Sequence, residues 1–396
     1  MEENPILTLP RPIVEAFFKC AEEEAGRSRA RIRSLEERLM QLKDQLKFTA
    51  IGEPTYGVTA AVDGSMSSGA SRRLGSDFGI YTAGYIAFNY KERIDEKYVA
   101  GSLSWVEGLK SFHTLLKLLM AYAERKLALE VYSKHRPDYI LLDGPFFFFR
   151  GYCRYIHNVE IRVDDVETGI DLIHRVRDMT LNLMNSGRAV CIIKRSVIRA
   201  IDGWILHHKG EEACIMTKDK HILSLLMPPG SIWPYESLLD NDPLIYASLY
   251  RFYRRLRQTG KRAEELRGKI DELIDQAKRD WARKFKLDLD MDVSKVPKTK
   301  RYYIRYSPAA PPFEVEAPEQ VNIEKFAQYF MGLHNPASGL PLPIDLIDEA
   351  VTLPRGSTTA FTREVEARLI VDRGIQDKRA ISDYFTYLNP QKEEYI

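Results

Sequence analysis

The sequence predicts an α/β protein in which a mixed sheet is flanked by helices. Two apolar runs, at residues 59–62 and 139–142, each end in an Asp-Gly pair, as a buried strand does where it meets a turn. Between them, residues 111–132 place apolar side chains at the spacing of an amphipathic helix. A third apolar run, at residues 188–193, ends in Lys194 and predicts another buried strand.

The first fifty residues are predicted to form a helical segment. From residue 12 to about residue 47, leucine and isoleucine recur at alternating steps of three and four, a short heptad pattern. This pattern fits a helix that packs on its own domain or a helix that pairs two copies of the chain. Residues 1–50 are therefore a candidate dimerisation segment, and residues 51–396 are predicted to form the main domain. The seam consists of Ile32, Leu35, Leu39, Leu42 and Leu46.

Three acidic residues are expected to meet at one edge of the sheet. An aspartate inside a buried strand would lose its hydration, so Asp63 and Asp143 are expected at strand tips that face a cleft. Glu124 lies on the intervening helix among core-facing neighbours, where an acid is rare without a partner. Such an oxygen-rich group suits Mg²⁺ or Mn²⁺, which support phosphodiester hydrolysis. At Asp143 alone, an Asx-turn before Gly144 is the alternative.

Basic residues are the candidates for nucleic-acid contact. Arg72 and Arg73 follow the first strand and precede a predicted strand or hairpin at residues 78–88. Lys194 either binds a phosphate beside the metal or extends from its strand end into solvent. A later strand interleaves bases with tyrosines, which fits either a backbone-gripping surface or an ordinary edge strand. Its candidate contacts are Lys300, Arg301, Tyr303 and Arg305.

The remaining segments are assigned by composition. Residues 163–185 are predicted to be helical, and residues 251–286 are predicted to be one long charged helix within a helical insertion at about 236–290. Residues 308–318 are interpreted as a proline-rich connection, and residues 323–333 as a short helix.

Taken in order, four of these motifs resemble the NurA family of archaeal and bacterial nucleases. They are Val-Asp-Gly-Ser at 62–65, the helix bearing Glu124, Leu-Leu-Asp-Gly-Pro at 141–145, and Ile-Ile-Lys at 192–194. The resemblance implies an RNase H-like sheet with Asp63, Glu124 and Asp143 as ligands of Mn²⁺ or Mg²⁺. It also implies cleavage of single-stranded DNA and of DNA ends, as in end resection, by a homodimer working with a HerA-type hexameric ATPase.

The chain departs from the family pattern near its C-terminal third. Leu340 and Asp348 stand where NurA-like proteins typically carry a tyrosine and a histidine. Asp348 is a candidate ligand, since a carboxylate binds hard cations, and an ordinary acid of a helix is the alternative. Two other functions stay open: a catalytically weakened or inactive DNA-binding subunit, and an RNase H-like nuclease that acts on RNA.

Net charge, cysteine spacing and the lengths of apolar runs indicate which kinds of protein and cellular location the sequence fits. The net charge of +2 means that any nucleic-acid surface must be a local patch. Four cysteines without metal-binding or disulfide-like spacing, an acidic N-terminus and no long apolar run predict a cytoplasmic protein that does not enter a membrane. No phosphate-binding loop of the G-x-x-x-x-G-K-[ST] type is found, so a motor activity would belong to a partner.

Overall fold

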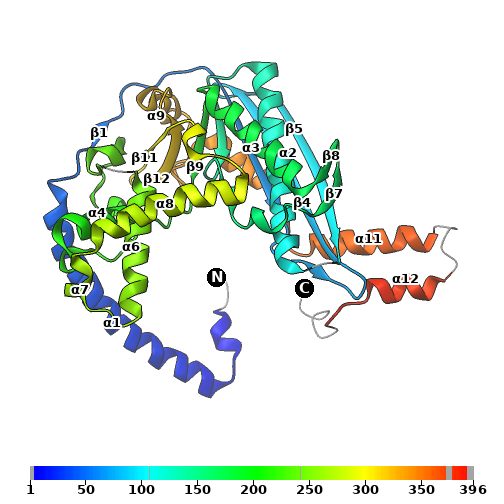
Figure 1. Ribbon diagram of the computed structural model, residues 1–396, viewed down its shortest axis with the longest axis horizontal. Coiled ribbons are helices and arrows are strands. Elements are labelled where there is room, and N and C mark those ends of the chain that lie inside the picture. Colours follow the sequence, from blue (N-terminus) through cyan, green and yellow to red (C-terminus); the bar gives the residue numbers. More distant parts are fainter. Residues whose placement is uncertain (1–3, 107, 241, 372–376, 390–396) are drawn as a thin grey trace.

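The computed structural model describes residues 4–106, 108–240, 242–371 and 377–389. Within these ranges a ten-stranded mixed sheet carries helices on both faces (Figure 1), so the predicted fold class is confirmed. The strand order is β1-β10-β11-β12-β9-β6-β2-β4, and β3 and β5 also pair with β4. The strands are β1 (Thr49–Ala50), β2 (Val58–Met66), β3 (Ser71–Arg72), β4 (Asp77–Asn89), β5 (Glu92–Trp105), β6 (Tyr139–Asp143), β9 (Ala189–Ile193), β10 (Ser231–Pro234), β11 (Thr299–Arg305) and β12 (Phe313–Pro318); β7 (Glu160–Val163) and β8 (Val166–Thr168) form a separate hairpin.

The centre of the sheet is parallel. Ala61 of β2 lies opposite Leu141 of β6, and Leu141 lies opposite Val190 of β9. The C-terminal ends of these three strands therefore meet at one edge. On the other side of β2, β4 and β5 run antiparallel, and β5 forms a long border whose side chains are mostly exposed. This is the RNase H-like arrangement that the family resemblance implied.

Helices cover the two faces because alternate strand residues point in opposite directions. On one face, α2 (Leu109–His135) and α3 (Gly169–Asn185) pack against residues such as Val62 and Leu142. On the other face, α9 (Ile323–Met331) and α10 (Leu342–Val351) pack against residues such as Ala61, Leu141 and Ile192. The middle positions of the central strands are thereby buried on both faces, which explains their continuous apolar sequence.

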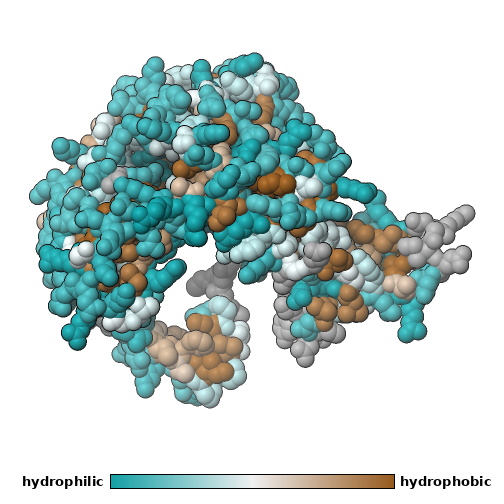
Figure 2. Space-filling model, viewed as in Figure 1, coloured by the Kyte–Doolittle hydropathy of each residue, from teal (hydrophilic) through white to brown (hydrophobic). Residues whose placement is uncertain are grey.

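The N-terminal helix α1 (Arg11–Lys43) is confirmed, and its two halves differ. Leu39, Leu42 and Leu46 are buried in a cluster with side chains from residues 200–277, a mainly helical part of the chain. This half therefore packs on its own chain, as one of the two interpretations proposed. The first half is exposed, and Figure 2 shows hydrophobic side chains gathered there; Phe17 and Phe18 are 50% and 53% exposed.

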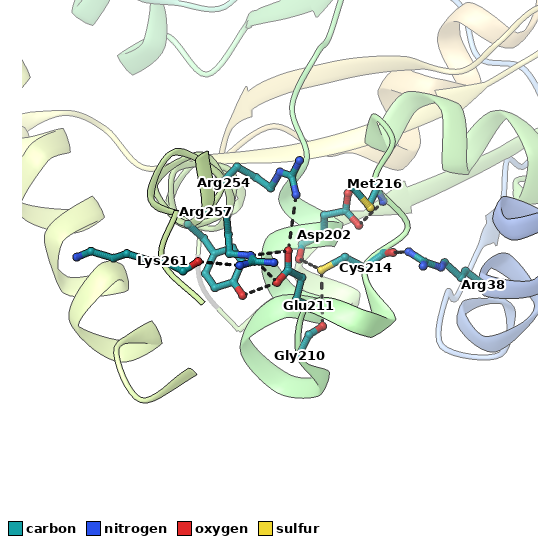
Figure 3. A network of polar contacts seen from close by, with 10 residues as sticks. Arg38, Asp202, Gly210, Glu211, Cys214, Met216, Arg254, Arg257 and Lys261 are labelled. Carbon is teal, nitrogen blue, oxygen red and sulfur yellow. Dashed lines mark hydrogen bonds and ion pairs between the residues drawn. The ribbon is translucent and has the colours of Figure 1, made fainter. Parts of the chain in front are cut away.

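Polar contacts also fix the end of α1 to the helical region (Figure 3). Arg38 donates a hydrogen bond to the carbonyl oxygen of Cys214. Beside it, the buried Asp202 accepts backbone hydrogen bonds from Ile215 and Met216. Glu211, in the same network, forms ion pairs with Arg254 and Arg257. The helical region consists of α4 (Ala200–Lys209), α5 (Asp219–Leu226), α6 (Pro243–Gln258), α7 (Ala263–Arg267) and α8 (Ile270–Leu289).

Two predictions about elements were wrong. The long helix at 251–286 is divided into α6, α7 and α8, and Gly260 adopts a φ of +88° at the first break. The supposed connection at 308–318 contains β12, which lies between β9 and β11 inside the sheet. The chain ends in α11 (Ser357–Val371) and α12 (Lys378–Phe385), which form a hairpin beside β3 and β4. No helix among the described residues is long and apolar enough to cross a bilayer.

Candidate metal centre

Three carboxylates converge at the edge where the parallel strands end. Asp63 lies in β2, Asp143 is the last residue of β6, and Asp348 lies in the last turns of α10. One carboxylate oxygen from each lies within 4.8 Å of the others. The strand pairing brings the first two together, and the packing of α10 on β2 and β4 adds the third. The side chains are 4%, 26% and 51% exposed in that order, so the group opens to solvent at Asp348.

Lys194 is the cation at this group. It follows the last residue of β9, and its Nζ lies 3.2 Å from Asp143 Oδ2, 3.2 Å from Asp348 Oδ2 and 3.9 Å from Asp63 Oδ2. Its side chain is only 16% exposed. The ammonium therefore faces the carboxylates. The other sequence interpretation, in which Lys194 extends from its strand end into solvent, does not describe this side chain.

The crowding of acids changes their proton affinity. Burial, with the charges of Asp143 and Glu124, raises the pKa of Asp63 well above its usual range. Burial also raises the pKa of Asp143, against the opposing effect of the Lys194 ammonium. For Lys194, burial would lower the pKa, but the surrounding carboxylates outweigh it and raise the pKa. One ammonium thus compensates the negative charge of these acids only in part.

The residues present fit a hard divalent ion. Asp63 Oδ1 accepts a hydrogen bond of 2.7 Å from the backbone N–H of Gly64. Asp63 Oδ2 is buried and has no hydrogen-bond partner among the described residues. A buried carboxylate oxygen without a donor is costly unless a cation satisfies it. The donor set is made only of carboxylate oxygens, which suits Mg²⁺ or Mn²⁺ better than softer metals.

Glu124, the third predicted ligand, lies beside this group and outside it. A Cβ atom placed on Gly64 would approach Glu124 Oε1 to 2.6 Å, so the glutamate lies over the residue after Asp63. Its Oε2 is 3.5 Å from Arg125 Nη1. Burial raises the pKa of Glu124 to about 7, although the Arg125 charge opposes the shift. The structure therefore brings together Asp63, Asp143 and Asp348, and leaves Glu124 as a buried neighbour.

Two residues that hold the loop after Asp143 were missed in the sequence. The backbone N–H of Phe146 donates to Glu316 Oε2 at 3.3 Å, and its carbonyl oxygen accepts from Arg125 Nη2 at 3.3 Å. Glu316 is in turn paired with Arg301 at 3.1 Å. The loop is thus fixed at both backbone polar groups of Phe146. Glu314 and Glu316, alternating within the apolar residues 313–317, were the available signal for a buried ionic network.

Three of the predicted nucleic-acid contacts are structural residues. Tyr303 is fully buried. The side chain of Arg301 is 9% exposed and ion-pairs with Glu314 at 2.5 Å. Arg73 is 7% exposed; it donates to the Phe385 carbonyl at 3.0 Å and stacks on the ring of Tyr387. These side chains are buried and engaged within the chain, so they offer almost no surface for the nucleic-acid contact that the sequence predicted.

The other three remain at the surface in differing degrees. Arg72 is 52% exposed and pairs loosely with Asp77, with 3.4 Å between the charged atoms. Lys300 is 37% exposed and pairs with Glu236. Arg305 Nη1 donates to the carbonyl oxygens of Ser224 and Met227, which ties β11 to α5. At the position of the expected family tyrosine, Leu340 is 8% exposed and packs in the core.

Comparisons with known proteins identify solved structures that share the fold of this chain. No protein-family model and no curated protein matches the chain. The crystal structure of the NurA nuclease from Sulfolobus solfataricus is 15% identical, with 93% of this chain and 99% of that chain covered at a TM-score of 0.55. Another crystal structure of NurA is 12% identical, with 94% and 100% covered at a TM-score of 0.49. A third, described as NurA bound to dAMP and manganese, is 13% identical, with 94% and 99% covered at a TM-score of 0.41.

The first of these matches extends over nearly the whole of both chains. At this identity it shows a common fold. The similarity to NurA that the ordered motifs predicted is therefore confirmed for the fold, and this chain has the fold of the NurA nuclease from Sulfolobus solfataricus.

Proposed function

We propose that this protein is a divalent-metal-dependent nuclease that hydrolyses phosphodiester bonds in DNA. The observation that carries the proposal is the convergence of Asp63, Asp143 and Asp348 on one point beside Lys194. A carboxylate-only site at the open edge of a sheet suits a hard cation and leaves room for a substrate on its exposed side. The NurA-like fold supports the same class of activity.

Each residue has a distinct task in this proposal. Asp63, Asp143 and Asp348 hold Mn²⁺ or Mg²⁺, which supplies activation of water and stabilisation of charge on the phosphate when bound. The Lys194 ammonium faces the same space and contributes a positive charge toward a bound phosphate. Arg125 and Glu316 keep the Asp143 loop in position through the backbone C=O and N–H of Phe146. Glu124 supports the centre through its packing against Gly64.

The substrate and assembly follow from the resemblance to NurA. We infer cleavage of single-stranded DNA and of DNA ends, in the context of end resection during repair and recombination. The active form would be a homodimer that acts with a HerA-type hexameric ATPase. Arg72 and Lys300 stay as candidate nucleic-acid contacts because both side chains reach the surface.

A metal-dependent cleavage assay tests the proposal. Labelled single-stranded DNA, duplex DNA with free ends and single-stranded RNA are incubated with the protein in Mn²⁺, Mg²⁺ or EDTA. We expect cleavage of DNA in either metal and none in EDTA. Asp348→Asn should be less active than the wild type at a limiting metal concentration, whereas Glu349→Gln is the matched control, since Glu349 is the next residue of α10 and is exposed. Equal activity of both variants, or cleavage of RNA alone, would contradict the proposal.

A further inference from the structure

A second charged feature lies close to the metal centre along the chain. Between the segment that follows Lys194 and helix α6 there is a cavity of about 610 Å³. Arg199, Arg251, Arg254 and Arg255 line it, together with Tyr250. No acidic residue lines it among the described parts of the chain. We call this feature the arginine groove.

The charges of the arginine groove are poorly compensated. Arg251, Arg254 and Arg255 occupy one face of α6, three and four residues apart, where like charges repel. Arg254 lies 3.6 Å from Glu211, but this carboxylate is closer to Arg257, at 3.0 Å. Within the described ranges, Arg199, Arg251 and Arg255 form no ion pair. The folded chain therefore carries a repulsion that a bound polyanion would relieve.

The position of the groove suits a substrate that extends from the metal centre. Arg199 follows Lys194 by five residues, and five residues of extended chain span at most about 18 Å. Lys194 itself faces the carboxylates. The short intervening segment keeps Arg199, at the border of the groove, within this distance of Lys194, which corresponds to a few nucleotides of a single strand.

We propose that the arginine groove binds the phosphate backbone of the nucleic-acid strand that is cleaved at the metal centre. This assignment rests on the proposed nuclease function. Guanidinium groups are suited to the task because they are always charged and bind phosphate oxygens with two parallel hydrogen bonds. The groove would thus hold a single strand at a fixed distance from the scissile bond, independently of base sequence.

The test measures binding without metal, so that it does not depend on cleavage. Affinity for a long single-stranded oligonucleotide and for a tetranucleotide is followed by fluorescence anisotropy in EDTA at several salt concentrations. The groove variant is Arg251→Gln/Arg255→Gln, and the matched control is Lys278→Gln/Arg279→Gln on the exposed face of α8. A further variant, Arg251→Lys/Arg255→Lys, keeps the charge. Thermal unfolding checks that all variants are folded.

For the long oligonucleotide, we expect the groove variant to bind at least about tenfold more weakly, with a salt slope smaller by about 1.4, since each lost contact to a single strand removes about 0.7. The control and the lysine variant should keep the wild-type slope. The tetranucleotide, which offers fewer phosphates, should bind the wild type more weakly than the long oligonucleotide does and should also lose affinity in the groove variant. Unchanged long-oligonucleotide binding in the groove variant, an equal loss in the control, or competition by polyglutamate as effective as by DNA would overturn the assignment.

The two proposals fail in different ways. If the wild-type protein cleaves DNA but the groove variant binds it normally, the arginine groove is wrong and the nuclease stands. If long-oligonucleotide binding depends on Arg251 and Arg255 but no metal supports cleavage, the groove binds nucleic acid and the proposed nuclease function is wrong.

Discussion

Lys194 Nζ lies 3.2 Å from Asp348 Oδ2, so an ion pair joins the end of β9 to helix α10 at the candidate metal centre. The same ammonium is equally close to Asp143. In the metal-free protein, Lys194 is therefore the counter-ion of the acids. A divalent cation and Lys194 would share these carboxylates, which makes the site responsive to the loss of any one of them.

Replacing either of the two strand aspartates should abolish activity. Asp63→Asn and Asp143→Asn each remove a ligand charge while keeping the side-chain shape. We expect nuclease activity to fall by more than about a hundredfold, because even residues that only support a ligand cost about 10–100-fold. Initial rates on single-stranded DNA measure the effect. Activity near that of the wild type in either variant would show that the metal centre is misplaced.

Asp348 should set the metal preference. If it is a ligand, Asp348→His introduces imidazole, which favours softer ions than carboxylate oxygen does, and activity should shift from Mg²⁺ toward Mn²⁺. Asp348→Ala should need more metal to reach its maximum. Metal titrations of activity compare both variants with the wild type. Three superimposable titration curves would exclude Asp348 as a ligand.

Removing one crowded acid should stabilise the metal-free fold at alkaline pH. Because the pKa of Asp63 is raised on folding, the folded state binds more protons than the unfolded state above about pH 4, and stability falls as pH rises through that window. Asp63→Asn removes this cost. Urea unfolding in EDTA should show the variant to be more stable than the wild type at about pH 8, with the difference vanishing toward about pH 4. A difference independent of pH would point to another cause.

Adjacent residues of β11 should respond very differently to loss of charge. Arg301→Met leaves Glu314 and Glu316 buried without their cation, and should cost about 3–5 kcal/mol of unfolding free energy. Lys300→Met breaks only a surface pair and should cost less than about 1 kcal/mol. Chemical denaturation of both variants provides the comparison. Similar losses of unfolding free energy would mean that the buried ion pairs of Arg301 stabilise the fold no more than the surface pair of Lys300 does.

Substitutions in the two halves of α1 should affect different properties, stability in the second half and self-association in the first. Leu42→Ala empties a position that is 2% exposed and should cost about 2–5 kcal/mol. Phe17→Ser/Phe18→Ser alters the exposed half and should leave unfolding nearly unchanged while weakening a homodimer. Sedimentation analysis measures the second effect. If the phenylalanine variant sediments like the wild type, the exposed half of α1 takes no part in self-association.

The features that could be predicted are those that a single short segment of the sequence determines. An apolar run followed by Asp-Gly singles out Asp63 and Asp143 without reference to any other segment. Asp143 does end β6, whereas Asp63 lies inside β2, which continues along β4 to Met66. The helix carrying Glu124 was predicted from the spacing of its own apolar residues, and the observed α2 includes the whole predicted range. Asp348 was found only through the order of motifs, because its helix carries no local sign that it contacts β2.

The errors concern properties that depend on distant neighbours. Bases and tyrosines on β11 looked like a surface for nucleic acid, but β10 and β12 enclose that strand on both sides. Arg301 pairs in register with Glu316, and Tyr303 with Glu314, so the residues that neutralise or cover β11 come from another part of the sequence. Whether a strand is central or at an edge is decided by sheet order, which no single segment encodes.

The long border strand β5 bears on how the protein remains dispersed. Within the described residues its outer side has no neighbour, so its free N–H and C=O groups could recruit another extended chain. Its first half is dense in charge, and Lys97 is bound by Glu130 of α2 at 2.7 Å. An incoming strand would have to bury these charges, so β5 protects the sheet against edge-to-edge aggregation while the protein is concentrated or newly synthesised. The charged residues are Glu92, Arg93, Asp95, Glu96 and Lys97.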